Sequence, residues 1–131
     1  DYSEGSWDND GNYSVKKYGT TKIALSPDVI SSFGFEVYPT KNLLLNFTNK
    51  YIGEQYLSNT EPADGKLSSF LVSDLLIRYS PNWLNLKKIE FSLLVNNLFD
   101  VKYESNGYYD GGGYYFPQAG INVLGGISIR L

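Results

Sequence analysis

The chain has 131 residues, of which 42% are apolar and 16% aromatic, so it can form one folded domain with a modest core. It contains neither cysteine nor histidine, which excludes disulfides, thiolate chemistry and histidine-based triads or metal clusters. Its net charge of −3 offers no basic footprint for a phosphate backbone, so no nucleic-acid partner is expected.

Residues 1–18 are polar and rich in glycine and acidic side chains, which predicts a loop. Within it, residues 8–12 (DNDGN) invite comparison with a calcium-binding loop. The helix-loop-helix calcium pattern would need glycine and glutamate at two positions that are occupied here by Tyr13 and Gly19. A solvated acidic loop is therefore the preferred interpretation, and no metal site is predicted.

Most of the remaining chain alternates apolar and polar residues with the period of two that is typical of β-strands. Firm strands are predicted over residues 30–38, 43–56, 67–80, 88–95 and 121–131. Residues 20–26 alternate more weakly before Pro27 and form a possible sixth strand. No comparable stretch shows the 3.6-residue apolar period of an amphipathic helix.

One face of these strands is predicted to be apolar and the other to carry charges. The charged set is Glu36, Lys50, Glu54, Asp74, Arg78, Glu90 and Arg130. The spacing of four between Lys50 and Glu54, and between Asp74 and Arg78, fits cross-strand pairs on a wet surface better than a transport path. In a membrane barrel the apolar face would meet lipid, with interfacial aromatics at Tyr38, Tyr51, Tyr56, Tyr79 and Trp83, whereas in a soluble sheet the charged face would simply be solvated.

The connections alternate in length, since those at 39–42 and 81–86 are shorter than those at 57–66 and 104–120. Up-and-down membrane barrels show this asymmetry. In lipid every backbone polar group must be paired, and single-chain barrels start at about eight strands, so other strands would have to pair the edges of this sheet. Two alternatives remain open: a small soluble antiparallel β-module that binds carbohydrate, and an oligomeric membrane barrel with few strands per chain.

The C-terminal third carries a more specific pattern. Residues 92–104 (SLLVNNLFDVKYE) and 115–120 (YFPQAG), followed by a terminal strand, resemble the signature near the end of TonB-dependent outer-membrane receptors. Residues 51–60 (YIGEQYLSNT) resemble the penultimate-hairpin segment of that family, and residues 26–30 (SPDVI) fit as well. The resemblance covers residues 23–131 and is greatest to the versions common in Bacteroidetes-type bacteria.

This resemblance implies an all-β fold: an antiparallel up-and-down transmembrane β-barrel of about 22 strands around a plug domain. The chain would supply about the last five or six strands, with residues 1–131 as the C-terminal barrel segment and 1–19 as an extracellular loop. The plug domain and the TonB box are expected to be absent from this sequence. The barrel signature normally ends in an aromatic residue, whereas here Leu131 follows Arg130.

The same resemblance implies a non-enzymatic receptor of the cell outer membrane that imports a scarce nutrient, such as an iron-siderophore, cobalamin or an oligosaccharide. The implied partners are the remaining strands and plug of the same receptor, TonB through its N-terminal part, outer-membrane lipid and the small-molecule ligand. No cofactor is implied. If residue 131 ends in the periplasm, residues 1–18, 57–66 and 104–120 lie outside the cell, and residues 39–42 and 80–87 are periplasmic turns.

The candidate ligand-binding residues are Tyr108, Tyr109, Tyr114 and Tyr115, which surround the glycine-rich residues 110–113. Aromatic rings stack on sugars or chelates, and glycines let a loop move. The preferred interpretation is nevertheless a self-packed loop whose aromatic side chains cap the rim of the barrel.

The pair Asn96 and Asn97 interrupts the alternation and predicts a bulge or turn with an architectural role. No catalytic residue is predicted, because nothing in the sequence brings Glu54 and Glu90 together as a carboxylate pair.

Overall fold

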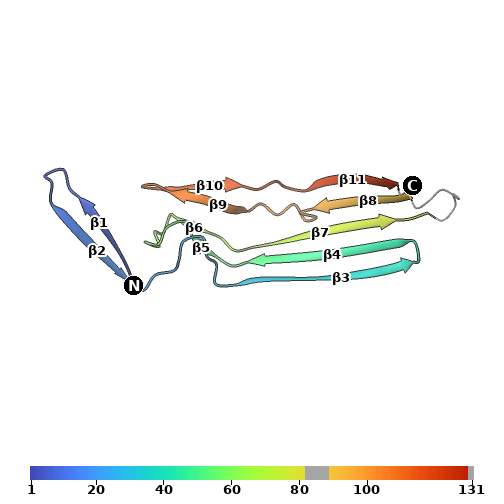
Figure 1. Cartoon of the computed structure of the whole chain (residues 1–131), viewed down its shortest axis with the longest axis horizontal. Coiled ribbons are helices and arrows are strands. Elements are labelled where there is room, and N and C mark those ends of the chain that lie inside the picture. Colours follow the sequence, from blue (N-terminus) through green and yellow to red (C-terminus); the bar gives the residue numbers. More distant parts are fainter. Residues whose placement is uncertain (82–88, 130–131) are drawn as a thin grey trace.

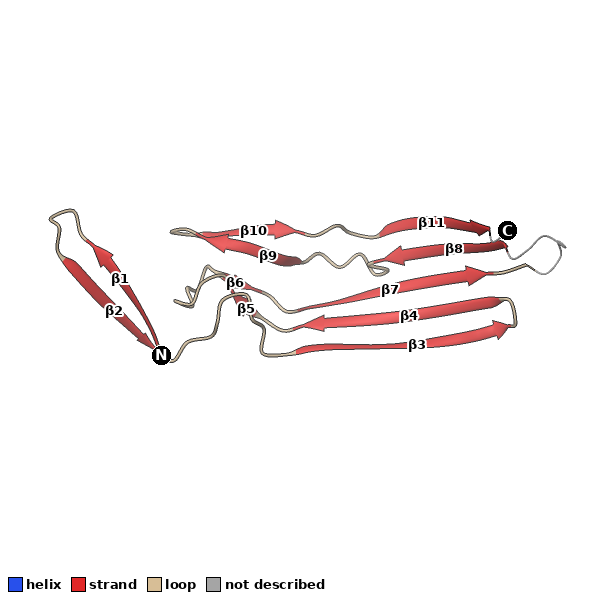
Figure 2. Cartoon of the chain, in the orientation of Figure 1, coloured by secondary structure: helices blue, strands red, loops and turns tan. Residues whose placement is uncertain are grey.

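The computed structural model describes residues 1–81 and 89–129, and every regular element within them is a strand (Figures 1 and 2). Its centre is a five-stranded antiparallel sheet with the order β11-β8-β7-β4-β3. These strands are β3 (Ile30–Thr40), β4 (Leu43–Ile52), β7 (Phe70–Tyr79), β8 (Ile89–Asn96) and β11 (Asn122–Ile129). The predicted all-β, up-and-down antiparallel fold is therefore confirmed.

Three two-stranded hairpins lie beyond one end of this sheet (Figure 1). They are β1 (Tyr2–Trp7) with β2 (Tyr13–Gly19), β5 (Gln55–Tyr56) with β6 (Lys66–Leu67), and β9 (Glu104–Tyr109) with β10 (Gly113–Pro117). The opposite end of the sheet carries the short β3–β4 turn. The long connections thus gather at one end, as their lengths predicted.

The described strands leave the sheet open on both sides. β3 pairs only with β4, and β11 pairs only with β8, so each edge strand has one side without a neighbour in the described part of the chain. A bulge between Val37 and Thr40 interrupts the β3–β4 ladder, and Pro39, which has no amide hydrogen to donate, lies within it.

The strand register aligns the apolar residues of all five strands on one face. Phe35 lies opposite Phe47, Phe47 opposite Leu75, Leu75 opposite Val95, and Val95 opposite Val123. Because alternate residues share a face, this row extends in both directions. The apolar residues of this face are Phe33, Phe35, Val37, Leu43, Leu45, Phe47, Tyr51, Leu71, Leu75, Ile77, Tyr79, Ile89, Phe91, Leu93, Val95, Val123, Ile127 and Ile129, and the polar residues Ser31, Asn49 and Ser73 share it. Ten of these apolar side chains are 40% or more exposed.

The other face mixes leucines with polar and charged residues, and we call it the mixed face. Asn46 donates from Nδ2 to Glu36 Oε1 at 2.8 Å, so neighbouring strands form polar pairs there. Glu54 pairs with Lys66, with 2.6 Å between Oε2 and Nζ, whereas Lys50 lies opposite Val72 in the register.

The loop predicted over residues 1–18 is wrong, because this segment forms the β1–β2 hairpin. The Asp8 carboxylate organises its turn, since Oδ1 accepts from the amides of Asp10 and Asn12 at 3.0 and 2.8 Å. Gly11 supplies the positive φ of 81° that the turn requires. Both faces of the hairpin are largely exposed, so its strands lack the apolar alternation by which strands are recognised.

Two further segments differ from prediction. Residues 104–120, predicted as a loop, contain the β9–β10 hairpin. Residues 20–26, the weak sixth strand, form a turn: Leu25 has a φ of 55°, and the Ser26 amide donates to the Ile23 carbonyl at 3.2 Å. The predicted connection after Pro81, the interfacial position of Trp83, and Arg130 and Leu131 lie outside the described residues.

The buried apolar residues of the described chain are few. They lie at the end of the sheet that carries the three hairpins, which we call the hairpin end. They are Ile52, Leu57 and Leu67, and Leu67 is only 1% exposed. Gly107 of β9 packs here, because a Cβ at that position would be 3.2 Å from the Leu57 side chain. In the described residues, the structure has no helix that is long and apolar enough to span a membrane.

Candidate functional site

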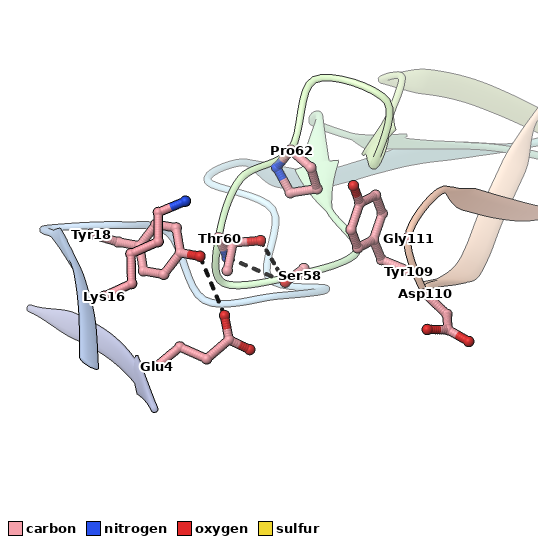
Figure 3. A pocket seen from close by; sticks show the side chains of 9 residues that line it. All are labelled: Glu4, Lys16, Tyr18, Ser58, Thr60, Pro62, Tyr109, Asp110 and Gly111. Atoms are coloured by element: carbon pink, nitrogen blue, oxygen red, sulfur yellow. Dashed lines mark hydrogen bonds between the residues drawn. The ribbon is translucent and has the colours of Figure 1, made fainter. Parts of the chain in front are cut away.

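Three segments that are far apart in the sequence enclose a hollow of about 550 Å³ at the hairpin end (Figure 3). One wall comes from the β1–β2 hairpin, another from the β9–β10 turn, and the loop before β6 lies between them. The lining residues are Glu4, Lys16, Tyr18, Ser58, Thr60, Pro62, Tyr109, Asp110 and Gly111.

The β1–β2 wall is a small polar cluster around one ring. Glu4 and Lys16 are cross-strand partners, which places both side chains on one face of the hairpin. The Tyr18 hydroxyl donates to Glu4 Oε2 at 3.3 Å, and Lys16 Nζ lies 4.8 Å from the centre of the Tyr18 ring. The wall therefore offers a carboxylate, an ammonium group and an aromatic face.

Hydroxyl groups line the loop between the two walls. The Ser58 and Thr60 hydroxyl oxygens are 3.0 Å apart, and the Thr60 amide donates to Ser58 Oγ at 3.2 Å. The loop closes tightly, because the Leu57 amide donates to the Gly65 carbonyl at 2.7 Å and the Gly65 amide to the Pro62 carbonyl at 3.0 Å. Both hydroxyls are thus held in fixed positions along the hollow.

The second wall is formed by Tyr109. Its ring lies against Gly65, since a Cβ there would be 2.9 Å from Tyr109 Cδ2. Partial burial, and then the negative charge of Asp64, raise the pKa of Tyr109 above its usual range. A tyrosine hydroxyl is neutral at physiological pH and can donate a hydrogen bond.

The segment after β2 holds the hairpin beside this loop. The Lys22 amide donates to Glu61 Oε1 at 2.5 Å, and the Ala24 amide donates to Asn59 Oδ1 at 2.6 Å. The Lys22 ammonium also pairs with the Asp28 carboxylate. These contacts place the first wall of the hollow next to residues 58–62.

The structure divides the four predicted tyrosines between two faces of the β9–β10 hairpin. Tyr108 and Tyr114 stack with ring centres 4.7 Å apart, and each is 50% exposed. Tyr109 and Tyr115 lie on the opposite face, where the Tyr115 hydroxyl donates to the Asp64 carbonyl. Of the four, Tyr109 alone is among the residues that line the hollow.

The residues missed by sequence reasoning are those of the other two segments. Glu4, Lys16 and Tyr18 were assigned to an irregular loop, because the segment lacks the apolar alternation that identifies a strand. Ser58 and Thr60 lie in a predicted polar loop and carry no signal of their own.

The turn predicted at Asn96 and Asn97, with an architectural role, is confirmed. β8 ends at Asn96, and Asn97 follows with a φ of 50° and only 3% exposure. Asn97 Oδ1 accepts from the Val101 amide at 2.9 Å, and Nδ2 donates to the carbonyls of Val101 and Ala119 at 2.9 and 3.2 Å. Its own amide donates to Asp74 Oδ1 at 2.9 Å. The Asn97 side chain therefore connects the segment just before β9 to the segment just after β10.

A second hollow of about 350 Å³ lies on the mixed face beside this junction. The residues that line it include Lys50, Asp74, Tyr103 and Asn122. The Tyr103 ring covers Phe70 at a centroid distance of 4.3 Å. Two of its polar residues are hydrogen-bonded to each other, since Asn96 Nδ2 donates to Asn122 Oδ1 at 2.9 Å.

Among residues 1–81 and 89–129, no three acidic side chains converge in a way that could hold a metal ion. The acidic run 8–12 forms a turn instead. Hydrogen bonds from the backbone and side chain of Asn12 lower the pKa of Asp8, so its carboxylate remains ionised as a structural acceptor.

No protein-family model matches the chain, and no curated protein matches it. Solved structures do match the chain. The open form of the ferric-catecholate import receptor Fiu from E. coli K12 matches with a TM-score of 0.62 and 19% identity over 76% of this chain. The closed form matches with a TM-score of 0.62 and 16% identity over 93% of the chain. The chain spans only 15% and 22% of those two chains. At these identities the likeness shows the fold alone, an antiparallel all-β arrangement like that in part of those receptors.

Proposed function

We propose that the chain is the C-terminal barrel segment of a TonB-dependent receptor that imports a nutrient across the outer membrane. In this proposal residues 1–131 contribute structure and outer-loop surface, and no enzymatic activity. The remaining strands and the plug of the same receptor complete the barrel, and TonB acts through the N-terminal part. The Bacteroidetes-type origin rests on the sequence resemblance alone.

The observation that carries this proposal is the exposed apolar face. Phe33, Phe35 and Ile127 are 65%, 54% and 69% exposed, and they belong to one surface that crosses all five strands. Soluble monomers rarely expose contiguous apolar surface on this scale, whereas the outer wall of a membrane barrel requires it. The observation therefore weighs against the soluble β-module.

The open edges support the same proposal. β3 and β11 each present an unpaired side within the described chain, and unpaired backbone groups cost several kcal/mol each in lipid. Further strands of the same receptor would satisfy both edges. An oligomer of short chains would satisfy them as well, so the size of the membrane-inserted species separates these two architectures.

The proposed orientation places the three hairpins outside the cell and the β3–β4 turn in the periplasm, because membrane barrels carry longer loops outside and short turns inside. The chain itself contains no cysteine, which makes this orientation testable by labelling. Asn9→Cys marks the tip of the β1–β2 hairpin, and Lys41→Cys marks the β3–β4 turn.

We expect a membrane-impermeant maleimide to label Asn9→Cys in intact cells expressing the full-length protein with any other cysteines removed. Lys41→Cys is expected to react only after the outer membrane is permeabilised. The matched pair controls for expression, since both residues are exposed turn positions. Labelling of both sites in intact cells, or recovery of the protein in the soluble fraction, would contradict the proposal.

A further inference from the structure

The hollow described above has a chemistry that selects among nutrient classes. Its hydrogen-bonding groups are mixed: Ser58, Thr60 and Tyr109 provide hydroxyls, Glu4 provides an acceptor and Lys16 a donor. Hydroxyls that both donate and accept match a ligand whose own groups are hydroxyls. Its volume of about 550 Å³ is within the range of small-molecule sites.

Two aromatic rings add an apolar component to this polar lining. Tyr18 is on the β1–β2 wall and Tyr109 is on the β9–β10 wall, with the hydroxyls of Ser58 and Thr60 between them in Figure 3. A tyrosine ring offers an apolar face together with a polar tip. The C–H faces of a sugar ring are apolar while its rim is hydroxylated, so the two surfaces are complementary.

The charge of the whole hairpin end argues against an anionic ligand. Residues 1–29, 53–69 and 97–121 hold eleven acidic and five basic side chains, which gives a net charge of −6. The described strands of the sheet (30–52, 70–81, 89–96 and 122–129) hold three of each sign. In the hollow itself, Glu4 and Asp110 outnumber Lys16. A field of this sign repels an approaching anion and leaves a neutral molecule unaffected.

We infer that this hollow binds a neutral polyhydroxylated ligand of the carbohydrate class, and that it does not bind an anionic iron chelate. The inference rests on the proposed function, because only the proposed orientation turns the hollow toward the external medium. It differs from the predicted tyrosine cluster, since Tyr109 is the single member of that cluster that takes part.

The test uses the full-length receptor purified in detergent, screened on an array of neutral mono- to hexasaccharides, with a ferric catecholate complex as the anionic probe. We expect at least one neutral glycan to bind and the ferric complex not to bind. Thr60→Val removes one hydroxyl without changing the side-chain shape, and Lys16→Gln removes the ammonium donor. By calorimetry, each should weaken the best glycan about 5- to 20-fold, as expected for loss of one hydrogen bond to the ligand.

Lys17→Gln is the matched control. It makes the same charge change as Lys16→Gln, but neighbouring residues of a strand point to opposite faces, so Lys17 lies away from the hollow. We expect less than about a 2-fold change in affinity for Lys17→Gln. Equal losses for Lys16→Gln and Lys17→Gln would overturn the assignment of the hollow.

The inference is overturned if no neutral glycan on the array binds, or if the ferric complex binds and loses affinity in Lys16→Gln. The proposed function is judged separately. TonB-dependent uptake of an iron chelate that is weakened by Lys16→Gln would leave the proposed function intact and refute this inference, whereas a soluble location would refute the proposed function itself.

Discussion

Phe47→Arg tests whether the apolar face contacts lipid. Phe47 lies in the middle of β4 and is flanked by Phe35 and Leu75 on the neighbouring strands. An arginine on the lipid face near the bilayer midplane costs about 2–4 kcal/mol. The Phe35–Phe47 ring pair, with centroids 5.4 Å apart, is lost as well, at about 0.5–1.5 kcal/mol. The expected loss of unfolding free energy is therefore about 3–5 kcal/mol, which is more than 100-fold in the folding equilibrium.

The assay is denaturant unfolding of the full-length receptor refolded into phospholipid vesicles. Thr48→Arg is the matched control, because Thr48 is the next residue of β4, is exposed and belongs to the mixed face. It should cost less than about 1 kcal/mol, as is usual for wet surface positions. If the two variants lose the same stability, or if Phe47→Arg is tolerated, then the apolar face does not contact lipid and the membrane assignment fails.

Two further predictions concern the segment between β8 and β9. Asn97→Ala removes three hydrogen bonds at a site that is 3% exposed and leaves the Val101 amide unpaired, so we expect a loss of about 2–4 kcal/mol in the same unfolding assay. Asn97→Asp, which keeps the acceptor for Val101, should lose less, and equal losses would contradict this role. The Lys102 ammonium, followed by the Ile121 amide, holds the pKa of Asp100 below its usual 3.8. A lowered pKa means that the carboxylate contributes stability above pH 3.8 and that this contribution fades as the pH falls below it. Asp100→Asn should therefore reduce the fall in melting temperature at acidic pH. An unchanged fall would contradict this role of Asp100.

The face pattern of the sheet could be predicted from the sequence because strand periodicity is local. Phe33, Phe35 and Val37 alternate with Ser32, Gly34 and Glu36, and any pleated strand places the two sets on opposite faces. Continuity of the apolar face across five strands needed the register, which depends on the turns and on side-chain packing between strands. A slip of one residue in β7 would have moved Asp74 onto the apolar face.

The candidate site was harder to predict for a physical reason. Its walls come from residues separated by more than 100 positions, such as Glu4 and Tyr109, and no periodicity connects them. The β1–β2 hairpin has two wet faces, so it lacks the apolar alternation that identified the other strands. The tyrosine-rich composition of residues 108–115 suggested a ligand-binding cluster, but cross-strand pairing divides its rings between two faces of the hairpin.

By itself, the sequence determined the class of fold and the position of the main strands, because backbone geometry converts a two-residue period into a two-faced strand. It also determined the turn at Asn97, where a polar pair ends the alternation. The tertiary structure alone decided that Glu4, Thr60 and Tyr109 line one hollow. Such a site depends on long-range docking of hairpins, which is set by a few specific hydrogen bonds and not by any pattern along the chain.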